Sequence, residues 1–169
     1  GKLFEAISMA PQITISSVEG AAMAGAFGIA CATDFLVTMS DAKYALTETK
    51  IGLTPAQIAP YVIKRLGFSN AKRLMLMGTL FNGKKAFEMG MADYVADNEI
   101  EFSEQINSIK NQVNKCAPSA IGVTKKILNS HYNIDAEEAA LIFSNCVIHE
   151  EGLEGLASFF EKRKPYWNK

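Results

Sequence analysis

A run of small residues between Glu19 and Gly28, E-G-A-A-M-A-G-A-F-G, follows a predicted strand and opens a predicted helix. Small side chains let a ligand approach the main chain closely. The first turn of a helix offers unpaired N–H groups and the positive end of the helix dipole, which suit a bound anion or a developing oxyanion. Ala24 and Ala26 break the glycine pattern of dinucleotide-binding loops. The alternative explanation is tight packing of a small-residue helix on a sheet.

Glu48 lies between an apolar predicted strand and an apolar turn, within Y-A-L-T-E-T-K-I-G-L-T-P (44–55). A carboxylate in this setting suits general acid–base chemistry, because it can accept or donate a proton beside a bound substrate. The alternative is a structural role, in which Glu48 caps a helix or forms an ion pair with Lys50. The sequence pattern leaves both roles open.

Aromatic residues lie beside a basic cluster near the C-terminus, in F-F-E-K-R-K-P-Y-W (159–167). An aromatic ring can stack on adenine, and a neighbouring cation can bind a phosphate. The alternative is a solvated helix end, where basic side chains complement the negative end of the helix dipole.

The predicted elements that would position these residues are mostly strands in the first part of the chain and mostly helices in the rest. Alternating and continuous apolar patterns predict a strand over 12–18, a buried helix over 22–33, a strand over 35–39 and a short strand over 44–46. A strand, a helix and a second strand form a βαβ unit, which predicts a parallel sheet and an α/β fold. A further short strand is predicted over 92–95, and helices are predicted over 58–66, 70–77, 84–89, 100–116, 119–132, 136–150 and 152–164.

Composition narrows the classes of function. The chain has 169 residues with 49% hydrophobic side chains, enough for the core of one ordinary domain. Its net charge of -1 argues against a nucleic-acid partner. Three separated cysteines argue against disulfides and favour the cytoplasm. His131 and His149 have no neighbours at ligand spacing, so no metal site is expected. No apolar run reaches the ~20 residues that span a bilayer, so no membrane partner is expected.

Taken together, these segments resemble the enoyl-CoA hydratase/isomerase (crotonase) family over essentially the whole chain. Each matching segment is weak alone, and their order along the chain makes the resemblance specific. The segments are I-T-I-S-S-V-E-G (13–20), A-x-A-G (within 22–26), C-A-T-D (31–34), A-K-Y-A-L-T-E-T-K-I-G-L-T-P (42–55), R-L-G (65–67), A-F-E-M-G-M-A-D-Y-V (86–95) and E-G-L-A-S-F-F-E-K-R-K-P (154–165).

The resemblance implies a fold and a set of partners. Residues 1–95 would form part of a superhelix of stacked ββα units, and 96–169 a helical region that associates with neighbours in a homotrimer or a dimer of trimers. The substrate would be an acyl-CoA, so that CoA belongs to the substrate and no separate cofactor is needed. Phe159 and Lys162 match positions that contact the adenine and phosphate region of CoA.

The resemblance also implies roles for the small-residue turn and for the glutamate. Gly25 matches the residue whose backbone N–H is one of two oxyanion donors, and Glu48 matches a catalytic acid/base. Ala24 and Gly28 match substrate-binding positions. Typical hydratases carry a second glutamate at the place of Gly28, so this chain keeps one carboxylate of the pair.

The function implied is hydration of a branched or carboxylated enoyl-CoA with a single glutamate, through an enolate held in an oxyanion hole. One alternative is an enoyl-CoA double-bond isomerase, since one glutamate is enough to move a proton. Another is a non-catalytic fragment that binds CoA or assists assembly. The family's other oxyanion donor would precede residue 1, so the isolated chain is expected to be inactive.

Overall fold

The fold is described from a computed structural model, which places residues 1–129 and 134–168. The chain divides into two compact units. One combines Gly1–Ser8 with Thr14–Ser108, and the other combines Met9–Ile13 with Ile109–Lys169. The long helix α5 (Glu99–Val113) contains the division, so it contributes to both units.

The larger unit contains two small sheets, each of three strands in the described part of the chain. In the first, β3 lies between β1 and β6, and both pairings are parallel. In the second, β4 pairs with β2 in parallel and with β5 in antiparallel register. The strands are β1 (Ile15–Val18), β2 (Ala21–Met23), β3 (Phe35–Met39), β4 (Lys43–Ala45), β5 (Phe81–Asn82) and β6 (Tyr94–Ala96).

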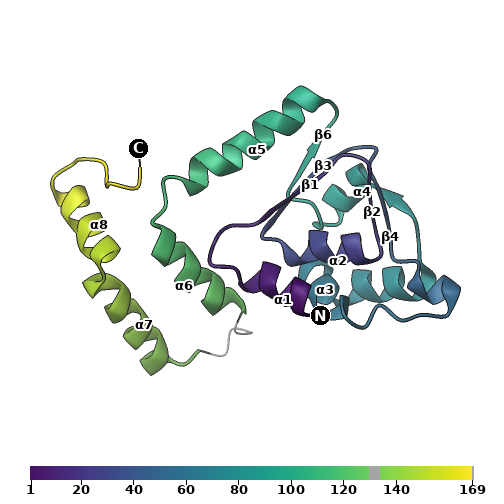
Figure 1. Cartoon of the computed structure of the whole chain (residues 1–169), viewed down its shortest axis with the longest axis horizontal. Coiled ribbons are helices and arrows are strands. Elements are labelled where there is room, and N and C mark those ends of the chain that lie inside the picture. The colour runs from purple at the N-terminus through teal and green to yellow at the C-terminus, as the bar shows by residue number, and fades with distance from the viewer. Residues whose placement is uncertain (130–133, 169) are drawn as a thin grey trace. The chain divides into compact units, whose positions relative to one another are not determined.

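Helix α2 (Gly25–Ala32) is the central helix of this unit and packs against α3 (Figure 1). Its sequence, G-A-F-G-I-A-C-A, has no polar face, which is typical of a helix surrounded by protein. Phe27 and Ala30 are accordingly buried in the core. The remaining helices of the unit are α1 (Lys2–Met9), the 3-10 helix η1 (Glu48–Ile51), α3 (Ala59–Met77) and α4 (Gly83–Glu88).

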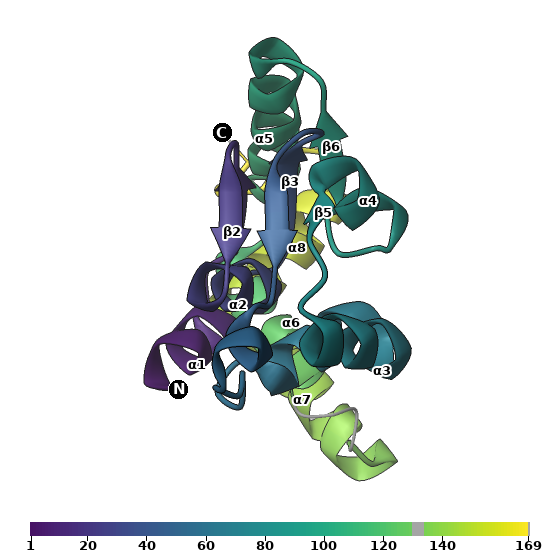
Figure 2. The same ribbon diagram turned by 90° about the vertical axis from the view of Figure 1, so that its right-hand side faces the viewer.

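The prediction of a helix over 22–33 was wrong for its first turn. Ala21–Met23 form strand β2, and the helix begins only at Gly25 (Figure 2). Pairing with β4 explains the difference, because the register Ala22↔Tyr44 gives these main-chain groups partners outside their own segment. A run of small residues suits either structure, and the neighbouring strand decides between them.

Helix α3 bends where the sequence predicted a break. Gly67 has φ 70° and ψ 162°, far from helical values, while the residues on both sides are helical. A non-glycine residue rarely adopts such a φ, so glycine allows the chain to change direction there. The predicted helices over 58–66 and 70–77 are therefore the two arms of one kinked element.

The smaller unit is helical in its described part, with α6 (Pro118–Asn129), α7 (Ala136–Ile148) and α8 (Glu150–Phe160). Lys125 is buried, and its Nζ donates to the Gln12 carbonyl at 2.7 Å, which joins the Met9–Ile13 segment to this unit. The predicted end of a helix near residue 132 and His131 lie outside the described residues. No helix in the described ranges is long and apolar enough to cross a membrane.

Helices α7 and α8 form a nearly continuous rod (Figure 1). Asp135 caps α7, as its position before an apolar helix predicts, and its Oδ1 accepts from the Glu138 N–H at 2.8 Å. His149 separates the two helices, and its Nδ1 accepts from the Glu151 N–H at 3.3 Å. The imidazole of His149 is therefore the N-cap of α8.

Candidate active site

The turn from β2 into α2 holds the main chain in an unusual conformation. Ala24 has φ 48° and ψ -116°, a region that residues with a Cβ seldom adopt. Its N–H donates to the Ala45 carbonyl at 3.1 Å, and its own carbonyl accepts from the Gly28 N–H at 3.1 Å. The next residue, Gly25, is the first of the helix, so its N–H has no acceptor inside α2. The turn thus presents a main-chain donor at the positive end of a helix dipole.

Glu48 follows the neighbouring strand β4 and begins η1. Its Oε2 is buried and has no hydrogen-bond partner among the described residues. Neither structural alternative from the sequence is seen, since η1 has no side-chain cap and no ion pair joins Glu48 to Lys50 in the described part of the chain. A buried carboxylate oxygen without a partner is costly in a purely structural role and points to a ligand or a reacting proton.

The β2–β4 pairing brings these two features together. Met23 lies opposite Ala45 in parallel register, so the residues that follow both strands leave the same edge of the sheet. One strand leads to Gly25 and the other to Glu48. The structure therefore places the predicted oxyanion donor and the predicted acid/base on adjacent connections of one sheet.

Gly28 lies one helical turn beyond Gly25 and is buried. A Cβ at position 28 would lie 2.9 Å from Ile58 Cβ and 3.1 Å from Phe4 Cε1. The space beside Gly28 is therefore filled by apolar side chains, and a carboxylate there would need them to move. Sequence reasoning missed Ile58 and Phe4, because nothing in the local pattern says that they meet at this glycine.

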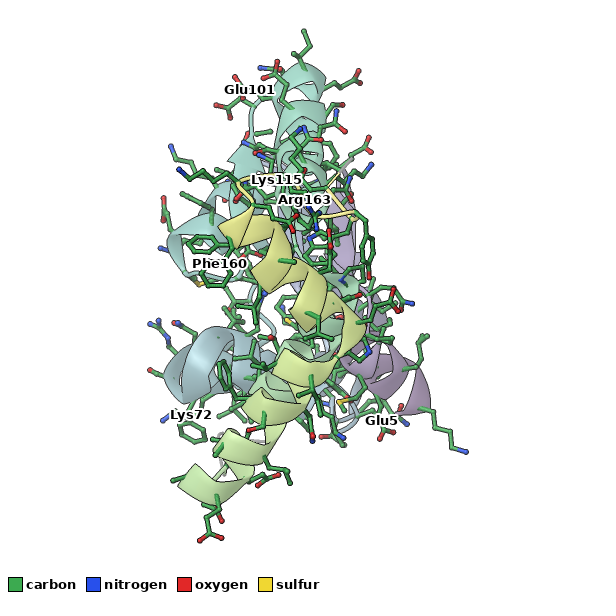
Figure 3. All side chains as sticks on the ribbon, turned by 90° about the vertical axis from the view of Figure 1, so that its left-hand side faces the viewer. Glu5, Lys72, Glu101, Lys115, Phe160 and Arg163 are labelled. Atoms are coloured by element: carbon green, nitrogen blue, oxygen red, sulfur yellow. The ribbon has the colours of Figure 1, made fainter. Side chains whose placement is uncertain are left out.

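Phe159 and Lys162 belong to the smaller unit, whereas Glu48 belongs to the larger one. Phe159 is 77% exposed and packs edge to face on Phe160. Figure 3 shows the ring of Phe160 at the end of α8 and Arg163 just beyond it. Lys162 is exposed and has a φ of 54° in the turn that ends the helix. Their contact with CoA remains a prediction.

Cys31 lies on α2 but does not offer a nucleophile. Burial raises the pKa of its thiol to about 12, and the charge of Arg65 opposes that shift only in part. The thiolate is the reactive form of cysteine, so this side chain is inert at neutral pH. No cluster of three or more His, Cys, Asp or Glu side chains that could hold a metal ion occurs among the residues with described positions.

Comparison with known proteins gives matches over nearly all of the chain. The sequence model of the enoyl-CoA hydratase/isomerase family matches residues 1–169. A crotonyl-CoA hydratase of Syntrophomonas wolfei is 28% identical, over 96% of this chain and 64% of its own length. A carnitinyl-CoA dehydratase of Proteus mirabilis is 28% identical, over 90% of this chain and 62% of its own length.

Solved structures agree with these sequence matches. Pseudomonas aeruginosa AtuE superposes with a TM-score of 0.95 at 35% identity, covering 99% of this chain and 67% of that protein. The chain spans 66% of the length of one curated relative and 54% of the length of another. The matches thus cover this chain almost completely and its relatives in part.

Proposed function

The chain belongs to the enoyl-CoA hydratase/isomerase family, and we propose that its protein adds water to the double bond of an enoyl-CoA, with Glu48 as the acid/base and the Gly25 N–H as one oxyanion donor. The acyl group we favour is branched or carboxylated. CoA is then part of the substrate, and no further cofactor takes part.

One observation carries this proposal: the buried Oε2 of Glu48, which has no hydrogen-bond partner among the described residues, on the connection adjacent to the turn that presents the Gly25 N–H. In the proposed reaction, Glu48 removes a proton from water as the oxygen attacks the β-carbon. Negative charge moves to the thioester oxygen, where the Gly25 N–H and the α2 dipole stabilise it. Glu48 then returns the proton to the α-carbon, so that the atoms of water are added across the double bond.

Isomerisation is the second candidate, and Gly28 is the observation that favours it. Position 28 holds no side chain, and apolar groups of Ile58 and Phe4 occupy the adjoining space. A single carboxylate can take a proton from one carbon of an enoyl-CoA and return it to another without a water molecule. The same Gly25 N–H would stabilise the enolate in both reactions.

The test is Glu48→Gln in the complete natural protein, assayed with crotonyl-CoA, a branched 2-enoyl-CoA and a 3-enoyl-CoA. The variant keeps the size of the side chain but cannot carry the proton, so we expect turnover to fall about 10²- to 10⁴-fold. Glu99→Gln changes an exposed carboxylate on α5 and serves as the matched control. Full turnover by Glu48→Gln would remove the acid/base assignment.

The reaction products and a measurement of CoA binding distinguish hydration, isomerisation and a non-catalytic binding role. A 3-hydroxyacyl-CoA identifies hydration, whereas a shifted double bond identifies isomerisation. If the natural protein binds CoA in calorimetry but turns over none of the three substrates, the non-catalytic binding role is the correct one.

We also propose that the protein works as a homotrimer or a dimer of trimers. Helices α7 and α8 expose large apolar side chains to solvent, among them Phe143 at 71% and Phe159 at 77%. An apolar cavity of about 710 Å³ lies between α6, α7 and α8 in the same unit. Exposed apolar surface of this kind is typical of an interface.

The cysteines are free, which supports a cytoplasmic location.

A further inference from the structure

The segment that carries Glu48 is attached to the start of helix α2 at two points, one on each side of the glutamate. Before Glu48, the Ala24 N–H donates to the Ala45 carbonyl at 3.1 Å. After Glu48, the side chain of Ile58 packs against Gly28. The position of Glu48 relative to α2 therefore depends on both attachments.

The second attachment is a close packing contact that only glycine permits. A Cβ on residue 28 would lie 2.9 Å from Ile58 Cβ, closer than real Cβ atoms approach. Ile58 is 4% exposed, and its branched Cβ restricts the side chain to few rotamers. Ile58 Cγ2 would come closer still to the Cβ on residue 28, so the branched side chain of Ile58 packs directly against the main chain of Gly28. Phe4 adds a second apolar neighbour, with its Cε1 3.1 Å from the same point.

The main chain between the two attachments is itself hydrogen-bonded. The Leu53 N–H donates to the Glu48 carbonyl at 2.9 Å, which closes η1. The Ile58 N–H donates to the Pro55 carbonyl at 3.1 Å, which closes the next turn. A displacement at Ile58 is therefore transmitted along a short, internally bonded segment to Glu48.

We propose that Ile58, packed on Gly28, is a positioning residue that sets the distance between the Glu48 carboxylate and the Gly25 N–H. The inference rests on the proposed function, because it assumes that these two groups act on one substrate. Ile58 acts by holding the segment from Glu48 onward against the helix whose first N–H is the oxyanion donor.

The test compares three variants of the complete natural protein on whichever of crotonyl-CoA, the branched 2-enoyl-CoA or the 3-enoyl-CoA it turns over fastest. Ile58→Ala removes the atoms beyond Cβ, including Cγ2, the Ile58 atom that comes closest to Gly28, whereas Ile58→Val keeps the branched Cβ. Leu66→Ala is the matched control, because Leu66 is equally buried on α3 and belongs to the same core. We expect Ile58→Ala to lower kcat about 10- to 100-fold with little change in KM, since small misplacements of catalytic groups are costly.

Leu66→Ala is expected to lower the melting temperature as much as Ile58→Ala does while keeping kcat. Ile58→Val is expected to restore kcat to within about threefold of the parent, because it restores the attachment. If Ile58→Ala keeps kcat while Glu48→Gln abolishes it, the positioning role is wrong and the proposed function stands. If Glu48→Gln keeps kcat, the proposed function has failed and the positioning role falls with it.

A double-mutant cycle gives a second measurement that does not depend on turnover. Gly28→Ala should lower the melting temperature strongly in the parent and less in the Ile58→Ala background, because the loss of Cγ2 removes the more severe of the two collisions with residue 58. Equal losses in both backgrounds would show that the two residues do not hold one another.

Discussion

Ala24 holds the main chain in a conformation that costs about 1–3 kcal/mol for a residue with a Cβ. The hydrogen bond from its N–H to Ala45 and the helix that follows hold it there. The same conformation turns the chain so sharply that the next N–H, that of Gly25, is left free at the helix end. Strain at Ala24 and the free donor at Gly25 are thus two results of one turn.

Two substitutions at Gly25 test whether its N–H is needed, because one keeps this group and the other removes it. A Cβ at position 25 would meet nothing within 4 Å, so Gly25→Ala should keep the fold and most of the activity. Gly25→Pro fills a position that often accepts proline in helices but removes the N–H. We expect turnover to fall about 10²- to 10³-fold in the proline variant.

Circular dichroism and thermal melting would show whether both Gly25 variants fold. A proline variant that is folded and fully active would contradict the oxyanion role of this residue.

Cys31 should resist alkylation in the folded protein because its pKa is raised from 9.0 to about 12 by burial. Iodoacetamide at pH 9 should label the exposed Cys116 within minutes and leave Cys31 unlabelled, as read by mass spectrometry of peptides. Denaturant should abolish the difference. Because the unfolded thiol loses its proton near 9.0 and the folded one near 12, Cys31 also makes the free energy of unfolding fall as the pH rises through that window.

Rapid labelling of Cys31 under native conditions would show that α2 opens far more readily than its buried surroundings indicate. A Cys31→Ala variant should lack the loss of stability that this thiol contributes between pH 9.0 and 12.

Among the elements, the kink in α3 depends on Gly67. Replacing Gly67, at φ 70° and ψ 162°, by alanine should lower the free energy of unfolding by about 1–3 kcal/mol, because the strain remains although space is available. Gly20→Ala is the control, since its added Cβ also meets nothing within 4 Å and its φ is not positive. Urea unfolding of both variants checks the prediction, and equal losses would contradict it.

The helices and strands also show which parts of the fold can be predicted from sequence patterns. The strand over 35–39 and the capped helix beginning at residue 136 were predicted where β3 and α7 lie, because a long apolar or capped pattern needs no distant partner to be recognised. Strand β2 was missed, since its small residues become a strand only through pairing with β4. The candidate residues Gly25 and Glu48 came from the sequence and its resemblance to a family, whereas Ile58 required knowing which segments touch.

At the scale of the whole molecule, the apolar faces of α7 and α8 predict self-association. We expect light scattering of the natural protein to give a mass of three or six subunits, and Leu141→Ser with Phe143→Ser to lower it, because burying apolar surface drives assembly. Ile100→Ser is the matched control, as Ile100 is 73% exposed but lies on α5. An unchanged mass in the double variant would place the interface elsewhere.

The close fit of Ile58 over Gly28 also restricts the order in which substitutions can accumulate. A larger residue at position 28 would collide with Ile58 unless position 58 had already become smaller. A smaller residue at 58 would first leave a cavity and weaken the core. A larger residue at 28 or a much smaller one at 58 is therefore unfavourable as a single step, so large changes at the two positions are expected to occur together.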